Sequence, residues 1–147
     1  MQDRDLPTVM TIETAAYPFP WTLQNFQDSL QVGYRAKVLE LDDHLVGYGL
    51  MSIGAGEANI LNLCVHPNHQ RSGHGRRILK HLLALAKQAE VTTVFLEVRA
   101  SNYAAIQLYL QTGFNQVGIR KGYYTKDQNQ KEDGLILALE LKFYSKY

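Results

Sequence analysis

Residues 65–75 read VHPNHQRSGHG and join two segments whose hydrophobic patterns differ. Residues 60–65 form a nearly continuous apolar run, typical of a short buried strand, whereas the apolar residues at 78, 79, 82, 83 and 86 form one stripe of a helix. A loop that leads into a helix leaves the first helical N–H groups without acceptors, beside the positive end of the helix dipole. Because Gly73 and Gly75 carry no Cβ, an anion can approach these groups. The stretch therefore predicts a phosphate-binding turn.

Positive charge is concentrated around this turn. Residues 58–89 contain no Asp or Glu and hold five of the chain's 15 Lys and Arg residues, whereas the rest of the chain has more acidic than basic side chains. The pattern indicates a local anion site. Two closely spaced glycines alone do not prove such a site. They leave open the alternative of an ordinary solvated basic helix face behind a tight turn.

Two common phosphate motifs do not fit the turn. A P-loop requires Lys-Ser or Lys-Thr after its last glycine, and a Rossmann fingerprint requires a third Gly or an Ala where this chain has Ile78. The remaining pattern, V-x-P-x-x-Q-x-x-G-x-G, resembles the acetyl-CoA-binding signature of the GNAT N-acetyltransferase superfamily. The resemblance implies that backbone amides of the loop hold the pyrophosphate of CoA.

Composition sets the outer limits. The 147 residues, 46% hydrophobic and 20% charged, suffice for one domain with a core, so we expect a single domain over 1–147, which the resemblance identifies as an N-acetyltransferase domain. The formal charge of +1 gives no reason to expect nucleic acid, and no apolar run approaches the ~20 residues of a membrane helix. The first residues lack the layout of a signal peptide, and the single Cys64 cannot form an internal disulfide. We therefore expect a cytoplasmic protein.

Hydrophobic periodicity and turn residues predict the order ααβββαβαββ. Helices are expected at 6–16, from the N-cap Thr22 to about 30, at 76–86 and at 102–111, and strands at 34–41, 45–53, 58–66, 91–98, 114–119 and 135–141. Trp21 and Phe26 fit a hydrophobic staple, Gly113 closes the fourth helix, and residues 125–134 read as a polar loop. The first three strands are expected to form an antiparallel meander. This order suits a mixed α/β (α+β) fold, a twisted and mostly antiparallel sheet with helices on both faces, as in the GNAT fold.

Glu97 interrupts an apolar strand, and a carboxylate there needs a reason because its desolvation costs several kcal/mol. One reading is a salt bridge to Arg99 or to a residue of the basic loop. The other is a general base whose pKa is raised by partial burial. The sequence leaves both open. Tyr109 follows Asn102 by seven residues, about two helical turns, so both side chains can face one ligand, although a core position is the commoner fate of a helical Tyr.

Several segments together look very like the bacterial ribosomal-protein-alanine N-acetyltransferase subfamily. They are Phe19-Pro20-Trp21, LEVRASN at 96–102, Ala105-Ile106, Leu108-Tyr109, Gly113-Phe114, Arg120 and Tyr123-Tyr124. The similarity spans nearly the whole chain. It implies direct acetyl transfer, with Glu97 as the general base that accepts the proton of the substrate amine and Tyr109 as the general acid that protonates the departing CoA thiolate.

The same resemblance implies which residues contact the two substrates. Those for acetyl-CoA are Leu63, Cys64, Val65, Arg71, Ser72, Gly73, His74, Gly75, Arg76 and Asn102. The backbone amides of Cys64 and Val65 would polarise the thioester carbonyl. Tyr123 and Tyr124 would border the groove for the acceptor peptide, the alternative for both being a core position.

A metal site is not expected. His66, His69 and His74 lie near Cys64, but their spacing matches none of the usual zinc sites. Cys64, inside an apolar strand, fits a small core residue better than a nucleophile.

The leading hypothesis, which the resemblance implies, is an N-alpha-acetyltransferase that moves the acetyl group of acetyl-CoA to the N-terminal alanine of small-subunit ribosomal protein eighteen. An α-amine has a pKa of about 7.7–8.0 against about 10.4 for Lys, so a modest base suffices near neutral pH. The alternatives are an acetyltransferase for protein lysine or a small amine, and a non-catalytic acetyl-CoA-binding module, against which the presence of both Glu97 and Tyr109 argues. The expected partner is a protein N-terminus, with no direct nucleic-acid or membrane contact. The sequence does not determine the oligomeric state, and we favour a monomer.

Overall fold

The computed structural model describes residues 1–144, and its helices and strands follow the predicted order ααβββαβαββ. The helices are α1 (Leu6–Ala16), α2 (Leu23–Gln31), α3 (His74–Gln88) and α4 (Tyr103–Thr112). The strands are β1 (Arg35–Leu41), β2 (His44–Gly54), β3 (Glu57–Val65), β4 (Thr93–Arg99), β5 (Asn115–Thr125) and β6 (Lys131–Glu140). None of the helices within residues 1–144 is long and apolar enough to cross a membrane.

The strands form one sheet of six in the order β1-β2-β3-β4-β6-β5. Strands β1, β2 and β3 are the expected antiparallel meander. Helix α3 crosses over from β3 to β4, so these two strands run parallel. Strand β6 then lies between β4 and β5 and is antiparallel to both. The sheet is therefore mixed and mostly antiparallel, which confirms the predicted fold class.

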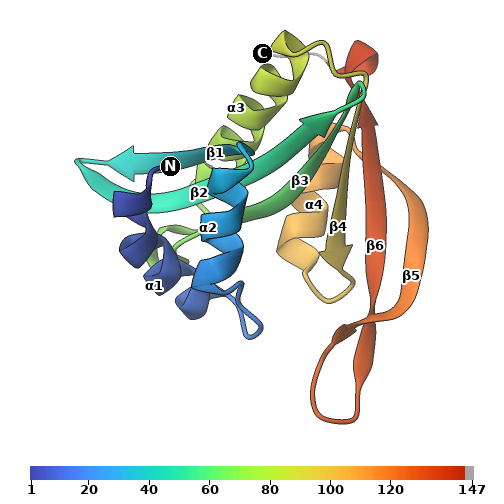
Figure 1. Cartoon of the computed structure of the whole chain (residues 1–147). Helices are drawn as coiled ribbons and strands as arrows, with labels where there is room; N and C mark the ends of the chain where they lie inside the picture. Colours follow the sequence, from blue (N-terminus) through green and yellow to red (C-terminus); the bar gives the residue numbers. More distant parts are fainter. Residues whose placement is uncertain (145–147) are drawn as a thin grey trace.

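Helices cover both faces of the sheet (Figure 1). The core on the α3 and α4 side includes Leu79, Leu82 and Leu83 of α3, each with no exposed surface. A second core lies beneath α1 and α2 and is made with residues of β1, β2 and β3. Its buried hydrophobic members are Leu6, Val9, Ile12, Phe26, Ala36, Tyr48, Leu50 and Cys64.

Local sequence signals fix several element ends as predicted. The Thr22 side chain accepts a hydrogen bond from the Asn25 amide at 3.1 Å and so caps α2. The Trp21 ring packs against Phe26 with the ring centres 5.1 Å apart, which confirms the staple. Gly113 closes α4 with a φ of +119°, a conformation that glycine adopts without a Cβ clash.

The hairpin near the C-terminus is longer than predicted. Strand β5 continues to Thr125 and β6 begins at Lys131, so both the strand bounds 114–119 and 135–141 and the polar loop 125–134 were wrong. The added strand residues are mostly polar and only Gly134 among them is buried, and hydrophobic alternation cannot detect strands that do not line a core. Their ladder nevertheless pairs Tyr124 with Glu132. The hairpin therefore projects past the body of the sheet (Figure 1).

Strands β3 and β4 pair over only part of their length. The pairing runs from Glu57 with Thr93 to Ile60 with Leu96 and ends there. On the other side of β3 the register with β2 shifts at the same point, because Leu61 is an unpaired bulge residue between Ile60 and Asn62. A bulge bends its strand, so residues 61–65 part from β4 and the sheet opens between its third and fourth strands (Figure 1).

Helix α3 lies unusually close to β2 because two glycines of that strand face it. A Cβ on Gly49 would stand 2.7 Å from Ile78 Cγ2 and 2.9 Å from Leu82 Cδ1, and one on Gly47 would stand 3.0 Å from Ile78 Cδ1. This close approach holds the start of α3, and with it the turn before the helix, against the sheet.

We therefore expect Gly49→Ala to lower the free energy of unfolding by about 1–3 kcal/mol, because the added methyl overpacks the contact between α3 and β2. Gly54→Ala in the same strand is the matched control, since a Cβ there meets no atom within 4 Å. The control should change stability by less than about 0.5 kcal/mol. Urea denaturation measures both, and equal stabilities would contradict the proposed close contact.

Candidate active site

The turn before α3 has the geometry of an anion site. Arg71 and Gly73 adopt left-handed conformations with φ of +64° and +83°, and Gly73 is the N-cap residue of α3 without a capping side chain. The first amide that bonds back one turn is that of Arg77, which donates to the Gly73 carbonyl at 3.1 Å. The amides of His74, Gly75 and Arg76 precede it and point out of the helix start, where an anion is stabilised.

Two further observations fit a bound anion at this turn. A Cβ on Gly73 would meet no atom within 4 Å, so the turn faces open space. The buried Nδ1 atom of His74 has no hydrogen-bond partner among the described residues. A buried nitrogen without a partner in the first turn of the helix is a group that a ligand can satisfy.

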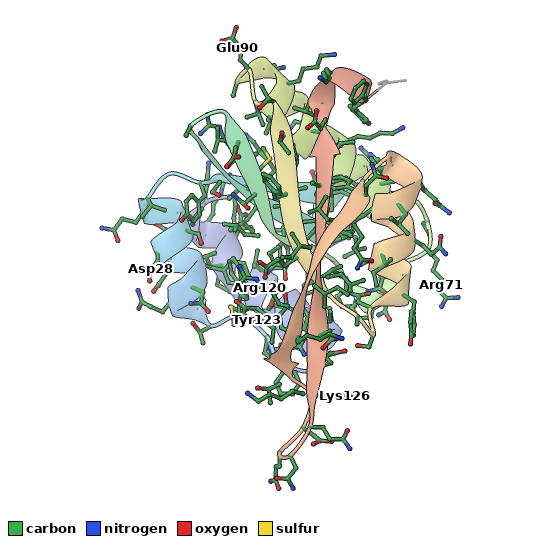
Figure 2. The ribbon with its side chains drawn as sticks, turned by 90° about the vertical axis from the view of Figure 1, so that its right-hand side faces the viewer. Asp28, Arg71, Glu90, Arg120, Tyr123 and Lys126 are labelled. Carbon is green, nitrogen blue, oxygen red and sulfur yellow. The ribbon has the colours of Figure 1, made fainter. Side chains whose placement is uncertain are left out.

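The other predicted residues of the loop differ in their availability. Arg71 and Ser72 are exposed, and Figure 2 shows Arg71 pointing outward beyond α4. The Arg76 side chain is instead engaged within the protein, since Nη2 donates to Gln111 Oε1 at 2.8 Å. Gln70, a signature residue, donates through Nε2 to the Val65 carbonyl at 3.0 Å and so ties the loop to the end of β3.

The alternation of backbone direction along β3 determines which of its amides face the opening between β3 and β4. The Leu63 carbonyl accepts from the Tyr17 hydroxyl at 2.7 Å and the Val65 carbonyl accepts from Gln70, so both point away from β2. The Cys64 carbonyl points the other way, because a Cβ on Gly47 of β2 would lie 2.9 Å from it. An extended residue directs its N–H and C=O to the same side, so the amides of Leu63 and Val65, rather than that of Cys64, face the opening.

Cys64 lies between the sheet and α1. It is 3% exposed, and burial raises the pKa of its thiol to about 11, so the thiol stays protonated near neutral pH. A protonated thiol is a poor nucleophile, which agrees with the interpretation of Cys64 as a core residue. Among residues 1–144 there is no cluster of three or more His, Cys, Asp or Glu side chains arranged to hold a metal ion.

Glu97 forms an ion pair, but with neither predicted partner. Arg120 Nε of β5 donates to Glu97 Oε1 at 2.7 Å, and the carboxylate side chain is 29% exposed. The Arg120 guanidinium also lies over the Tyr123 ring, 5.0 Å from its centre. Figure 2 shows Arg120 and Tyr123 together on β5, toward the side of the sheet where α2 lies. The salt bridge was one of two readings that the sequence left open, and its partner is neither Arg99 nor the basic loop but Arg120 of β5, a strand beyond β6.

Arg99 makes several contacts that the sequence interpretation missed. Its guanidinium lies between two aromatic rings, 4.9 Å from the centre of Phe19 and 4.5 Å from that of Tyr124. It also pairs with Glu132 at 3.0 Å and donates to the Thr125 carbonyl at 2.9 Å. Arg99 therefore links the loop between α1 and α2 to the β5–β6 hairpin, and no spacing in the sequence signals this link.

The two tyrosines assigned to the acceptor side lie next to each other. The Tyr123 and Tyr124 rings meet edge to face with their centres 4.9 Å apart. Tyr123 is 52% exposed, whereas Tyr124 packs so closely over Gly134 that a Cβ there would lie 2.9 Å from its ring. They share this part of the sheet with Glu97 and Arg120, where the Tyr123 ring remains exposed.

Tyr109 and Asn102 lie at opposite ends of α4. Asn102 caps the helix by accepting from the Ala105 amide at 3.3 Å. Tyr109 is 7% exposed, and burial raises its pKa above the ordinary tyrosine value. Burial likewise raises the pKa of Tyr17, with further contributions from Cys64 and Tyr109. Tyr17, which the sequence interpretation also missed, therefore lies near the interior end of the opening together with Tyr109.

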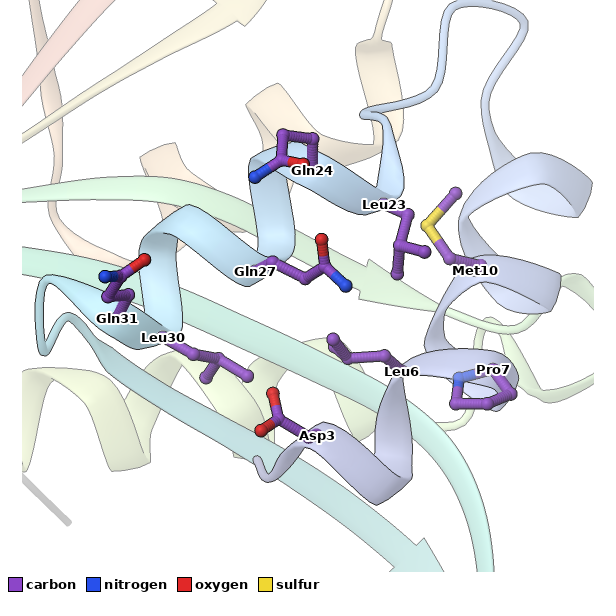
Figure 3. Close-up of a pocket in the computed structure, with 9 residues that line it drawn as sticks. All are labelled: Asp3, Leu6, Pro7, Met10, Leu23, Gln24, Gln27, Leu30 and Gln31. Atoms are coloured by element: carbon purple, nitrogen blue, oxygen red, sulfur yellow. The ribbon is translucent and has the colours of Figure 1, made fainter.

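A large groove lies elsewhere and contains none of these residues. It runs between α1 and α2 and has a volume of about 980 Å³ (Figure 3). Its lining residues are Asp3, Leu6, Pro7, Met10, Leu23, Gln24, Gln27, Leu30 and Gln31. With one carboxylate and no other titratable side chain, the groove offers no evident chemistry.

The sequence matches the acetyltransferase (GNAT) family over residues 6–114. The ribosomal protein bS18-alanine N-acetyltransferase of Salmonella typhimurium is 39% identical over 93% of this chain and 92% of its own length. The enzyme of the same name from Escherichia coli strain K12 is 36% identical over 96% of this chain and 95% of its own.

Solved structures give the same picture. The crystal structure of the ribosomal-protein-S18-alanine N-acetyltransferase from Escherichia coli has a TM-score of 0.90 and 35% identity, and the match covers 99% of this chain and 94% of that one. Arabidopsis thaliana Naa50 in complex with the bisubstrate analogue CoA-Ac-MVNAL has a TM-score of 0.81 at 21% identity, with 95% of each chain covered. This second likeness shows the shared fold.

Gly75→Val tests whether the turn binds acetyl-CoA. Valine carries two methyl groups more than alanine, and these should crowd the amides at the start of α3. We expect acetyl-CoA binding to weaken at least tenfold, about 1.4 kcal/mol. Gly75→Ala is the matched control, because its Cβ finds ordinary contacts, the nearest being Leu108 Cδ2 at 3.5 Å. The control should bind within about threefold of the unchanged protein. Calorimetric titration measures both, and equal affinity of a folded Gly75→Val protein would refute this site.

Proposed function

The chain belongs to the acetyltransferase (GNAT) family, and from this premise we propose that it acetylates the α-amine of an N-terminal alanine on ribosomal protein bS18. As a member of this family with N-acetyltransferase relatives along nearly its whole length, it is an acetyl-CoA-dependent N-acetyltransferase. The bS18-alanine acceptor is the one named for those relatives. The single observation that supports it most is their identity of 36–39% over at least 93% of this chain.

The acetyl-CoA side of the proposed site is built from β3 and the turn. Acetyl-CoA supplies the acetyl group as an activated thioester. The amides of His74, Gly75 and Arg76, together with Arg71 and Ser72, fit the role of holding its phosphates. Leu63 and Val65 direct their amides into the opening and are suited to polarise the thioester carbonyl. The neighbouring Cys64 and Gly73 shape the strand and the turn, and Asn102 positions the start of α4.

Glu97 is the proposed general base on the acceptor side. The ion pair with Arg120 orients its carboxylate, and its partial exposure lets an amine or an intervening water reach it. An α-amine with a pKa of about 7.7–8.0 is already partly deprotonated at neutral pH, so a carboxylate can remove the remaining proton as the new bond forms.

Tyr109 is the proposed general acid. Transfer of a proton from a tyrosine with a pKa of about 10 to a thiolate whose thiol has a pKa of about 8.5 is uphill, and the raised pKa of Tyr109 increases this difference. Tyr109 therefore stays protonated throughout the working pH range. It first donates a hydrogen bond to the sulfur and completes the transfer only as negative charge develops there.

The acceptor groove is proposed to lie between the α1–α2 loop and the β5–β6 hairpin. Tyr123 and Tyr124 supply aromatic surface on the hairpin side, and Phe19 faces them across Arg99. Residues 1–147 would act as one monomeric domain, although 145–147 lie outside the described residues. We place the reaction in the cytoplasm, because the acceptor named for the relatives is a ribosomal protein.

Two peptides test the acceptor. A peptide with an N-terminal alanine and several internal lysines should be acetylated on its α-amine, as mass spectrometry can locate. A copy with a blocked α-amine should react on the order of a hundredfold more slowly, because a lysine with a pKa of about 10.4 offers far less free amine. Efficient acetylation of the blocked copy would replace this proposal with a lysine-directed activity.

Glu97→Gln should lower kcat/KM for the alanine peptide by about a hundredfold, because the base is lost while the shape is kept. The loss should shrink as the pH rises through the amine pKa, since more amine is then free without assistance. Acetyl-CoA affinity should remain within about twofold. Glu140→Gln is the matched control, because Glu140 is the last residue of β6 in the same sheet. This variant should retain full activity. An active, folded Glu97→Gln protein would place the base elsewhere.

A further inference from the structure

Glu13 is a buried carboxylate that the proposed chemistry does not use. It lies on α1 with 1% of its surface exposed. A carboxylate in such a place must be satisfied by hydrogen bonds, because desolvation strongly disfavours its charged form. Glutamine or a hydrophobic residue of similar size would fit the same space at a lower desolvation cost. The retention of a carboxylate therefore calls for a specific reason.

Three donors surround this carboxylate, and its two oxygens serve different parts of the protein. Oε1 accepts from the Tyr48 hydroxyl of β2 at 2.6 Å and from Asn62 Nδ2 of β3 at 3.0 Å. Oε2 accepts from the backbone amide of Trp21 at 2.9 Å. One oxygen is thus fixed to the sheet, and the other holds the loop between α1 and α2, residues 17–22.

The same loop reaches both sides of the proposed site. At its start, the Tyr17 hydroxyl donates to the Leu63 carbonyl on the acetyl-CoA side at 2.7 Å. In its middle, the Phe19 ring lies over the guanidinium of Arg99, two residues from Glu97 along β4 and on the same face of that strand. Asn62 is the neighbour of Leu63 on β3, so Glu13 holds the loop to the strand segment that carries the proposed oxyanion amides.

We propose that Glu13 is a positioning residue that fixes the loop between α1 and α2, residues 17–22, relative to β3. In this way Glu13 sets where the acceptor amine meets the acetyl group. The inference rests on the proposed function, since it assigns the loop to acceptor binding. The chemical reason for a carboxylate is that both of its oxygens accept. A glutamine of the same shape has one accepting oxygen and one donating nitrogen, and that nitrogen would oppose either the Trp21 amide or the sheet donors.

Kinetics on Glu13→Gln test the proposal. KM for the alanine peptide should rise at least about fivefold, while the dissociation constant of acetyl-CoA stays within about twofold. Tyr48→Phe is the matched control, because it removes a sheet donor to Glu13 and leaves the Trp21 contact intact. The control should lower the melting temperature, as Glu13→Gln does, yet leave the peptide KM within about twofold. Unchanged peptide KM in Glu13→Gln, or an equal rise in both variants, would overturn the positioning role.

Trp21 is the only tryptophan of the chain and reports on the loop directly. In Glu13→Gln its fluorescence should be quenched by acrylamide more strongly than in the unchanged protein, whereas Tyr48→Phe should match the unchanged protein. Equal quenching in all three would overturn the proposal. This measurement needs no acceptor, so it tests Glu13 even where the unchanged enzyme fails to acetylate the alanine peptide, a result that would count against the proposed function alone.

Hydrogen exchange on the unchanged protein covers the case in which Glu13→Gln does not fold. The Trp21 amide should exchange as slowly as amides of the central strands, and the acceptor peptide should slow exchange of the loop further. Fast exchange of the Trp21 amide would show that the carboxylate does not hold the loop and would overturn the proposal.

Discussion

The parting of β3 from β4 after the pair Ile60 and Leu96 is the constraint on which the rest of the site depends. Backbone groups that lose a neighbouring strand need other partners, because unpaired buried N–H and C=O groups are costly. The Tyr17 hydroxyl and the Gln70 amide satisfy the Leu63 and Val65 carbonyls that β4 no longer reaches. The opening is therefore stable because side chains from the α1–α2 loop and from the turn before α3 replace a strand, and the amides of Leu63 and Val65 remain available.

The opening joins two faces of the sheet that differ in chemistry. The turn before α3 presents helix amides and Arg71, which suit phosphates, and Figure 2 shows Arg71 on the α4 side. Glu97 and Arg120 lie toward the side of α2, among aromatic rings that suit a peptide. Residues 94, 96 and 98 face the α3 core, so alternation along β4 turns Glu97 to the other face. In the proposed function, the two substrates bind on opposite faces and meet where the strands part, an arrangement that favours direct transfer between them.

The order of elements could be predicted because each element carries its own signal. Hydrophobic periodicity, the Thr22 cap and Gly113 are local features, and all agree with the structure. Features that depend on which strands become neighbours could not be predicted. The sequence left open a salt bridge from Glu97 to Arg99, yet the sheet places Arg120 of β5 within reach of Glu97. Arg99 is instead held by Glu132 and two aromatic rings. Helical periodicity places Glu13 on the same stripe as Leu6 and Val9, but the sequence does not show what satisfies its carboxylate, since the donors come from β2, β3 and the following loop.

Two costly features of the molecule lie in segments that the proposed function uses. Arg71 takes a left-handed conformation that disfavours side chains with a Cβ, and Glu13 keeps a carboxylate out of water. Neither is needed for a hydrophobic core, since the leucines of α3 and the packing of α1 and α2 supply one on each face. Features that oppose stability persist when the surrounding structure fixes them and when they serve binding or catalysis. Arg71 shapes the turn that the proposed function assigns to the phosphates, and Glu13 holds the loop that it assigns to the acceptor. In the proposed function, both costs therefore fall on segments that bind a substrate.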